Sequence, residues 1–160
     1  MENIQFVIDV EMKSYDELSE SDRMLIDAAK EATSRSYAPY SHFFVGASAL
    51  LSNGKIITGS NQENAAFPSG LCAERTAIFY ANSEYPNAAV KSMAVACRDQ
   101  QDFIERPSAP CGACRQVLLE TEKRYGKPMR VLLFSKKGIY IFKSVTDLLP
   151  FSFTNDYFKK

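Results

Sequence analysis

Residues 71–78 read LCAERTAI and place a thiol, a carboxyl and a guanidinium within four consecutive positions, from Cys72 to Arg75. An apolar run follows at once, and residues 72–82 (CAERTAIFYAN) have the pattern of a helix that begins at or near Cys72. The unpaired N–H groups at a helix N-terminus carry partial positive charge, which favours a thiolate over a thiol. This stretch therefore predicts a reactive or metal-binding cysteine at the start of a helix.

Helix and strand patterns alternate on both sides of this segment. Asn-Gly at residues 53–54 separates two apolar runs, which is a strong signal for a β-hairpin. The expected elements are helices at 19–37, 72–82 and 111–126, hairpins at 43–60 and 128–144, a strand at 90–99 and a short helix at 144–150. The mixture predicts the α/β class, as a three-layer α/β/α domain with one mixed five-stranded sheet.

The composition is that of an ordinary globular protein. Of the 160 residues, 46% are apolar and 24% are charged, and the formal net charge is zero. Proteins that bind a nucleic-acid polymer usually carry a basic excess, so we expect no such partner. No apolar run approaches the ~18 residues of a membrane helix, and the N-terminal residues lack the pattern of an export signal. We therefore expect a cytoplasmic protein with no membrane partner and with reduced cysteines.

A second cysteine motif lies further along the chain, in residues 110–116 (PCGACRQ). Cys111 and Cys114 are three residues apart, so in the first turn of a helix their side chains point to one face. Together with Cys72 they form a soft anionic set suited to Zn²⁺. A structural zinc site needs four protein ligands, whereas a catalytic site commonly supplies three and leaves one position to water. The remaining cysteine, Cys97, has the setting of a buried strand residue, so the count favours a catalytic site.

The neighbours of Cys72 fit the same interpretation. Three thiolates around Zn²⁺ give a net charge of −1, which the Arg75 guanidinium and the helix N-termini offset. Glu74 is then the acid or base that moves protons next to an activated water. Each motif alone is ambiguous. A lone C-x-x-C also occurs in redox pairs and in half of a structural zinc site, and an arginine on a helix is often a solvated surface residue.

In combination, these motifs resemble a known family. CAERTAI and PCGACRQ, together with YAPYSHFFVGASALL, TGSNQENAAFPSGLCAER and LLPFSF, closely resemble the small, homotetrameric, zinc-dependent cytidine deaminases of pyrimidine nucleoside salvage. The resemblance covers roughly residues 22–153. It implies one Zn²⁺ per chain, held by Cys72, Cys111 and Cys114, and it implies that Glu74 is the proton shuttle. Arg75 would balance the charge of the zinc site.

The resemblance also implies a set of substrate contacts. Asn61 and Glu63 would bind the ribose hydroxyls, and Phe43 would stack on the pyrimidine. The Ala73 backbone N–H would meet the ring carbonyl, and backbone near Pro110 would receive the amino group. Phe67 and Phe153 would line the sites from neighbouring subunits. Without the family, these residues have plainer explanations, because Asn and Glu are common in turns and one of Phe43 and Phe44 must face the core.

The implied activity is hydrolytic deamination of cytidine and deoxycytidine to uridine and deoxyuridine, with release of ammonia, by a cytoplasmic homotetramer acting on a small nucleoside. Two alternatives stay open. A structural zinc module that binds a protein partner predicts a fourth ligand, Cys97 or His42. The second is a deaminase for another substrate, such as a modified nucleoside, a nucleotide or an RNA base. A nucleotide or a polymer needs phosphate contacts, for which the sequence offers no P-loop and no basic run near the motifs.

Two departures from the family pattern accompany the resemblance. The first residues, 1–20, precede the usual start of the compact members, so we expect an N-terminal extension at 1–20 and a deaminase domain at 21–160. The extension is either an added strand or an arm that contacts another subunit. Phe67 stands where the family often has tyrosine, which removes a hydroxyl and leaves the packing intact.

Overall fold

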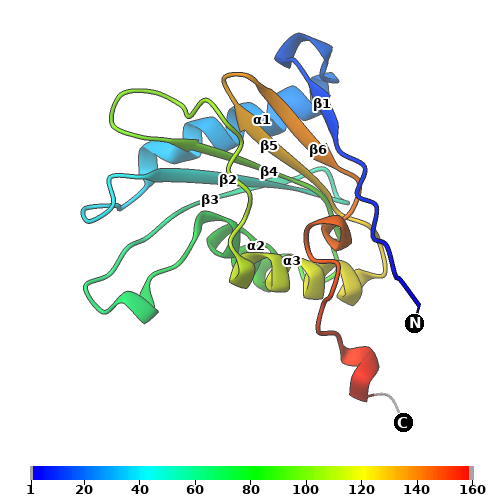
Figure 1. The fold of residues 1–160 in the computed structure, drawn as a ribbon. Coiled ribbons are helices and arrows are strands. Elements are labelled where there is room, and N and C mark those ends of the chain that lie inside the picture. The colour runs from blue at the N-terminus through cyan, green and yellow to red at the C-terminus, as the bar shows by residue number, and fades with distance from the viewer. Residues whose placement is uncertain (1, 159–160) are drawn as a thin grey trace.

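The structure, a computed structural model, describes residues 2–158 and contains one mixed sheet of six strands in the order β1-β6-β5-β4-β2-β3 (Figure 1). The strands are β1 (Glu11–Lys13), β2 (Phe44–Leu51), β3 (Ile56–Ser60), β4 (Val90–Arg98), β5 (Arg130–Ser135) and β6 (Gly138–Phe142). The helices are α1 (Glu20–Ala32), α2 (Ala73–Glu84) and α3 (Gly112–Tyr125). Only β4 and β5 run parallel among the paired strands of residues 2–158.

The predicted class and layers are confirmed, with one difference in the sheet. The prediction of five strands was one short, because Glu11–Lys13 pairs antiparallel with Ile139–Ile141 and adds β1 at the edge. The extension was expected to be either an added strand or an arm, and the count of five left it out because no neighbouring segment offered a hairpin partner. The short helix expected at 144–150 is a 3₁₀ turn at Val145–Leu148, and Ser19 caps α1 by accepting a hydrogen bond from the Asp22 backbone N–H.

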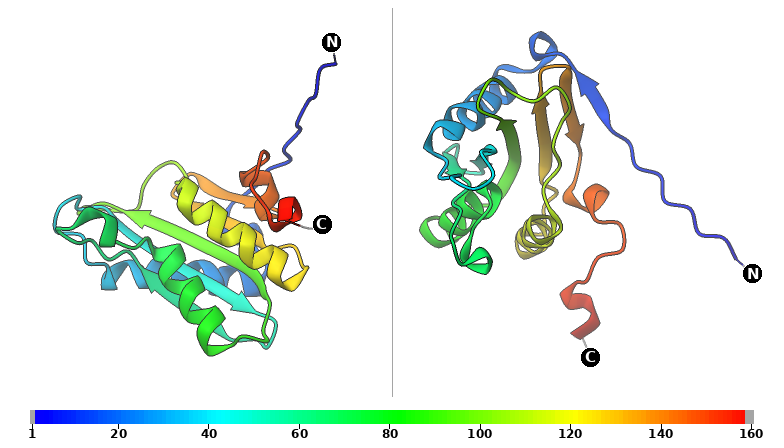
Figure 2. Two further views of the ribbon diagram at one scale, coloured as in Figure 1. Left: turned by 90° about the horizontal axis from the view of Figure 1, so that it is seen from below. Right: turned by 60° about the vertical axis from the view of Figure 1, so that its left-hand side comes forward.

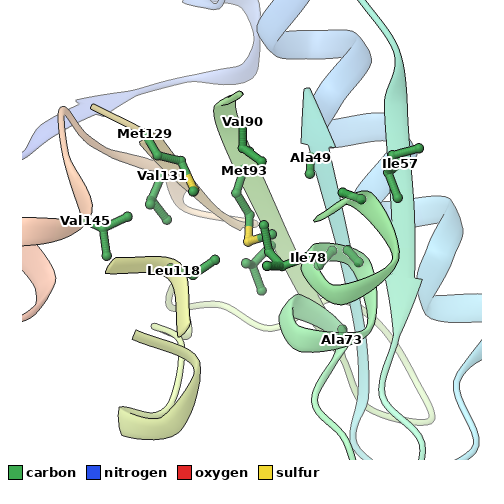
Figure 3. Close-up of a cluster of buried hydrophobic side chains, with 14 of the residues drawn as sticks. Ala49, Ile57, Ala73, Ile78, Val90, Met93, Leu118, Met129, Val131 and Val145 are labelled. Atoms are coloured by element: carbon green, nitrogen blue, oxygen red, sulfur yellow. The ribbon is translucent and has the colours of Figure 1, made fainter. Parts of the chain in front are cut away.

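Helices cover both faces of the sheet (Figures 1 and 2). Leu25 and Ile26 of α1 pack on one face, against a cluster that includes Leu132 of β5. On the other face, Ile78 of α2 and Leu118 of α3 meet the central strands in a second buried cluster (Figure 3). Because both faces of β4 and β5 are covered, their sequences read as continuous apolar runs instead of alternating ones. None of the helices in residues 2–158 combines the length and hydrophobicity needed to cross a membrane.

Gly59 of β3 allows α2 to lie close to the sheet. A Cβ atom at this position would lie 2.5 Å from the backbone oxygen of Ala73 and 2.5 Å from the backbone nitrogen of Ala77. Both atoms belong to the first turns of α2, the helix that follows Cys72. The glycine therefore sets the distance between the sheet and a helix that carries the candidate site.

A Gly59→Ala variant is expected to be destabilised by about 3 kcal/mol, because the backbone of α2 must move to admit the methyl group. Gly112→Ala is the matched control, since a Cβ at Gly112 meets nothing within 4 Å. Chemical denaturation of both variants measures the difference. If Gly59→Ala unfolds at the same denaturant concentration as Gly112→Ala, the close approach does not constrain α2.

Candidate metal centre and substrate cavity

Three cysteine sulfurs converge where α2 and α3 begin. Cys72 is the N-cap residue of α2, Cys111 is the N-cap residue of α3, and Cys114 lies in the first turn of α3. The Cys72 and Cys111 sulfurs are 3.8 Å apart, and the Cys111 and Cys114 sulfurs are 3.5 Å apart. All three sulfurs lie within 4.8 Å of one another. The fold thus brings together residues from two helix starts that are far apart in the sequence.

This spacing fits a zinc ion. Zn–S bonds of ~2.3 Å in tetrahedral geometry put the sulfurs about 3.8 Å apart. Among residues 2–158, the cluster of possible metal ligands contains these three cysteines and no fourth residue. Cys97 lies buried in β4 within the hydrophobic cluster. Three protein ligands with one open position are typical of a catalytic zinc site, so the geometry argues against the closed structural site of the first alternative.

The charge around Cys72 favours its thiolate. Hydrogen bonds from Cys114 and from Arg75 lower the pKa of the Cys72 thiol to about 5, against the opposing effect of burial. The Arg75 Nη2 atom is 3.7 Å from the Cys72 sulfur. By contrast, burial raises the pKa of Cys97 to about 12, which keeps that thiol protonated and unreactive. Arg75 therefore contacts the cluster, as expected of a residue that balances its charge.

Glu74 is a buried carboxyl at the same helix start. The residue is 4% exposed and lies in the first turn of α2, two residues after Cys72. Burial raises its pKa, and the negative charge of Cys72 adds to the effect. A carboxyl whose proton affinity is raised in this way is suited to accept a proton and to return it.

A cavity of about 450 Å³ opens beside the cluster. This volume lies within the range of small-molecule sites, ~300–1,000 Å³. Cys72 and Arg75 form one part of its lining, and Asn61, Glu63 and Phe67 form another. The structure therefore places five of the residues singled out from the sequence around one cavity.

Asn61 and Glu63, which line the same cavity as Cys72, are fixed in place by hydrogen bonds. Asn61 Oδ1 accepts from the Val45 backbone N–H at 2.8 Å, and Asn61 Nδ2 donates to the Phe43 carbonyl at 2.9 Å. Glu63 accepts from the Tyr40 backbone N–H at 2.9 Å and from the Ser41 hydroxyl. The Ser41 contacts and the Tyr40 amide lower the pKa of Glu63, so the carboxylate stays ionised. Both side chains keep spare capacity, since an amide has a second N–H and a carboxylate has further lone pairs.

The three predicted aromatic residues occupy different places. Phe43 is partly buried and packs against the core cluster, at the position just before β2. Phe67 is 78% exposed on the rim of the cavity, with its ring 6.1 Å from that of Tyr40. Phe153 lies in the C-terminal tail, where its ring stacks on Tyr157 and its carbonyl accepts from Gln116. It does not line the cavity that contains Asn61 and Glu63.

Sequence reasoning missed two residues that support the site. Arg115 donates from Nε to the Pro110 carbonyl and from Nη1 to the Leu148 carbonyl, each at 2.8 Å. It thereby fixes the backbone just before Cys111. Ser41 holds Glu63, as described above. Arg115 directly follows the proposed zinc ligand Cys114, so its place in the sequence could have indicated a role in the site. Ser41 contacts Glu63, which is 22 positions away, and no local pattern predicts that contact.

The comparisons with known proteins agree with this geometry. Residues 19–125 match the family model of the cytidine and deoxycytidylate deaminase zinc-binding region. The cytidine deaminase of Halalkalibacterium halodurans is 41% identical over 132 residues, which cover 82% of this chain and 93% of the relative. The cytidine deaminase of Sporosarcina psychrophila is 40% identical, with 82% and 90% covered.

Solved structures give the same result. A crystal structure of cytidine deaminase from Burkholderia pseudomallei matches with a TM-score of 0.70 and 39% identity, covering 85% of this chain and all of that one. The enzyme from Mycobacterium tuberculosis matches with a TM-score of 0.63 and 31% identity, covering 85% and 98%. The sulfur geometry and the match to a zinc-binding region confirm the predicted zinc cofactor. The chain therefore belongs to the cytidine and deoxycytidylate deaminase family.

Proposed function

We propose that the protein is a zinc-dependent cytidine deaminase that converts cytidine and deoxycytidine to uridine and deoxyuridine, with release of ammonia, in pyrimidine salvage. The observation that carries the proposal is the three-sulfur cluster with an open fourth position, next to buried Glu74 and a cavity of about 450 Å³. The names of relatives that are about 40% identical over most of their length support the substrate.

The residues around the cavity would bind and orient the nucleoside. Asn61 and Glu63 offer a donor and an acceptor to the ribose hydroxyls. Phe43, which packs against the core and is not among the residues that line this cavity, would stack on the pyrimidine. The Ala73 backbone N–H, which is the first of α2, points its partial positive charge toward the ring carbonyl. Backbone near Pro110 receives the amino group. Because Glu63 is anionic, a phosphate next to the sugar is repelled, so a nucleoside is favoured over a nucleotide.

Cys72, Cys111 and Cys114 would hold the zinc, which supplies a Lewis acid that lowers the pKa of water. Glu74 takes a proton from the attacking water and passes it to ring N3 while the water oxygen bonds to C4. Glu74 then moves the second proton to the exocyclic amine, the C4–N bond breaks, and ammonia leaves. One water is consumed and one ammonia is released, so atoms and charge balance. Arg75 offsets the negative charge of the three thiolates throughout.

We also propose that residues 21–160 form the deaminase domain after an N-terminal extension, and that the enzyme is a cytoplasmic homotetramer. Two features support sites completed by a neighbouring subunit. Phe153 lies outside the cavity of its own chain and is 60% exposed. The buried Arg75 Nε has no hydrogen-bond partner within residues 2–158, and a buried donor normally has one.

An ultraviolet time course with cytidine tests the reaction directly, with zinc measured on the same sample. We expect the cytidine spectrum to be replaced by that of uridine, at one zinc per chain. Deoxycytidine and its 5′-phosphate run in parallel, and faster turnover of the phosphate would contradict the assignment of a nucleoside substrate. Full zinc content without conversion of any of these three substrates would contradict the proposed function.

A Glu63→Gln variant is expected to lower kcat/KM for cytidine by about 10- to 100-fold, since a hydrogen bond to a charged group contributes ~1.5–3 kcal/mol. Combining this substitution with removal of the ribose hydroxyls from the substrate, by the logic of a double-mutant cycle, separates a ribose contact from a structural role. If Glu63 binds the ribose, the variant loses much less activity on 2′,3′-dideoxycytidine than on cytidine. Equal losses on both substrates would show that Glu63 acts only by holding Tyr40 and Ser41.

A further inference from the structure

The N-terminal arm, defined here as residues 2–13, has a regular pattern that the proposed function does not use. Apolar residues occupy every second position of an extended segment, so they share one face. They are Ile4, Phe6, Ile8, Val10 and Met12, and they are between 42% and 79% exposed. A strand with one apolar face is normally half-buried, whereas this face is open to water.

The arm has little contact with its own subunit. Glu11–Lys13 pairs with β6, but residues 2–10 leave the sheet and project past the body of the subunit (Figures 1 and 2). Among the described residues, no backbone hydrogen bond outside the strand ladders joins residues 2–10 to the rest of the chain. The contact of the Phe6 and Phe151 rings, at 4.6 Å, ties the arm to the C-terminal tail. The unpaired N–H and C=O groups of such a segment are a template for another strand.

The arm lies outside the segment that matches the family model. The family match begins at residue 19, and 85% of this chain is enough to cover the whole Burkholderia pseudomallei structure. The family match thus leaves the arm out, and its contacts with residues 21–160 include the pairing of Met12 with Tyr140 and the contact of Phe6 with Phe151.

The arrangement of the apolar residues is self-complementary. Positions 4, 6, 8, 10 and 12 are symmetric about Ile8, so two antiparallel arms centred there pair each apolar residue of this face with another one of the same face. In that register Asp9 lies opposite Val7 of the partner subunit, and Glu11 lies opposite Gln5 of the partner subunit. No two carboxylates are directly opposed, which avoids the repulsion of like-charged cross-strand pairs.

Apolar side chains next to the arm extend the surface that is available to such a contact. Besides the five arm residues, Tyr140, which pairs with Met12, is 38% exposed, and Phe151, which contacts Phe6, is 82% exposed. Edge-to-edge pairing places the apolar side chains of the two arms next to one another as cross-strand pairs, the contacts that stabilise paired strands. We propose that the arm pairs with the arm of a second copy of this chain, edge to edge through β1 and centred on Ile8.

Cross-linking tests whether the contact is between subunits. Two-fold pairing centred on Ile8 puts the two Ile8 side chains opposite each other, at a Cβ separation of ~4.5–5.5 Å. Mild oxidation of zinc-loaded Ile8→Cys is therefore expected to give a disulfide-linked dimer in dilute solution. Val7→Cys is the matched control, because its thiols sit ~7–8 Å apart on the diagonal. Dimer yield for Ile8→Cys no higher than for Val7→Cys and wild type would overturn the proposal.

Hydrogen exchange tests whether the arm is hydrogen-bonded along its edge. In wild type, every second backbone amide between residues 4 and 10, on the edge that meets the partner arm, is expected to be protected, although the isolated chain leaves these amides unpaired. Ile8→Asp, which opposes two carboxylates at the two-fold axis, is expected to remove this protection. Val7→Lys is the control, because it places a charge opposite Asp9 of the partner subunit without repulsion and is expected to keep the protection. Unprotected amides in wild type, or equal loss in both variants, would contradict the pairing.

Discussion

A Glu74→Gln variant is expected to bind one zinc per chain, to keep the fold, and to lose cytidine turnover by ~10²–10⁴-fold or more, the range in which positioned acids and bases contribute. The substitution keeps the size and the hydrogen-bonding ability of the side chain, so the packing of the 4%-exposed residue is preserved. The amide cannot accept a proton from water and pass it to the ring. The proton transfers therefore lose their carrier, while the cysteines are untouched.

The measurement is a set of initial rates from ultraviolet spectra, with zinc determined by elemental analysis on the same samples. Glu84→Gln is the matched control, because Glu84 ends the same helix and is exposed. The control should retain wild-type rates. Full turnover in Glu74→Gln would remove Glu74 from the mechanism. Loss of zinc in Glu74→Gln would instead assign it a role in building the metal site.

The second large effect concerns the metal ligands. Changing Cys114 to serine is expected to weaken zinc binding by well over ~100-fold, since loss of even an outer-shell partner of a ligand costs 10–100-fold. Activity should fall in parallel, because the water is no longer activated. Stability should fall as well, since Cys114 is fully buried and a metal that binds only the folded state stabilises it.

Cys97→Ala is the control that separates the catalytic site from a structural one. Cys97 is buried in β4, and its loss should cost a small amount of packing energy without changing the zinc content. Zinc affinity is measured by competition with a chelator, and stability by thermal unfolding with and without added zinc. Loss of zinc from Cys97→Ala would show a fourth protein ligand and would favour the structural-zinc alternative.

Much of the site was predictable because its parts are local in the sequence. Cys72 and Glu74 lie within three residues of each other, and Cys111 and Cys114 lie within one helical turn. Helix starts can be identified from capping patterns and apolar spacing alone. The α/β class followed from alternating helix and strand patterns, and the Asn-Gly at residues 53–54 marked the hairpin of β2 and β3.

Other features depend on contacts between distant residues, and no local pattern contains them. The pairing of Glu11–Lys13 with β6 joins segments more than 120 residues apart and made the sheet one strand larger than expected. Two hydrogen bonds likewise join residues that are far apart in the sequence, from Ser41 to Glu63 and from Arg115 to the Leu148 carbonyl. The position of Phe153 outside the cavity was also not evident from its motif.

The sequence by itself therefore determined which residue types make up the metal centre, which carboxyl accompanies them and which class of fold carries them. These features rest on helix and strand patterns that act over a few residues. Only the tertiary structure decided that the Cys72 and Cys111 sulfurs lie 3.8 Å apart, that Glu74 is buried, and that the arm ends in an edge strand with an open apolar face. The physical reason is that convergence and burial arise from packing two helices on a sheet, which no single segment encodes.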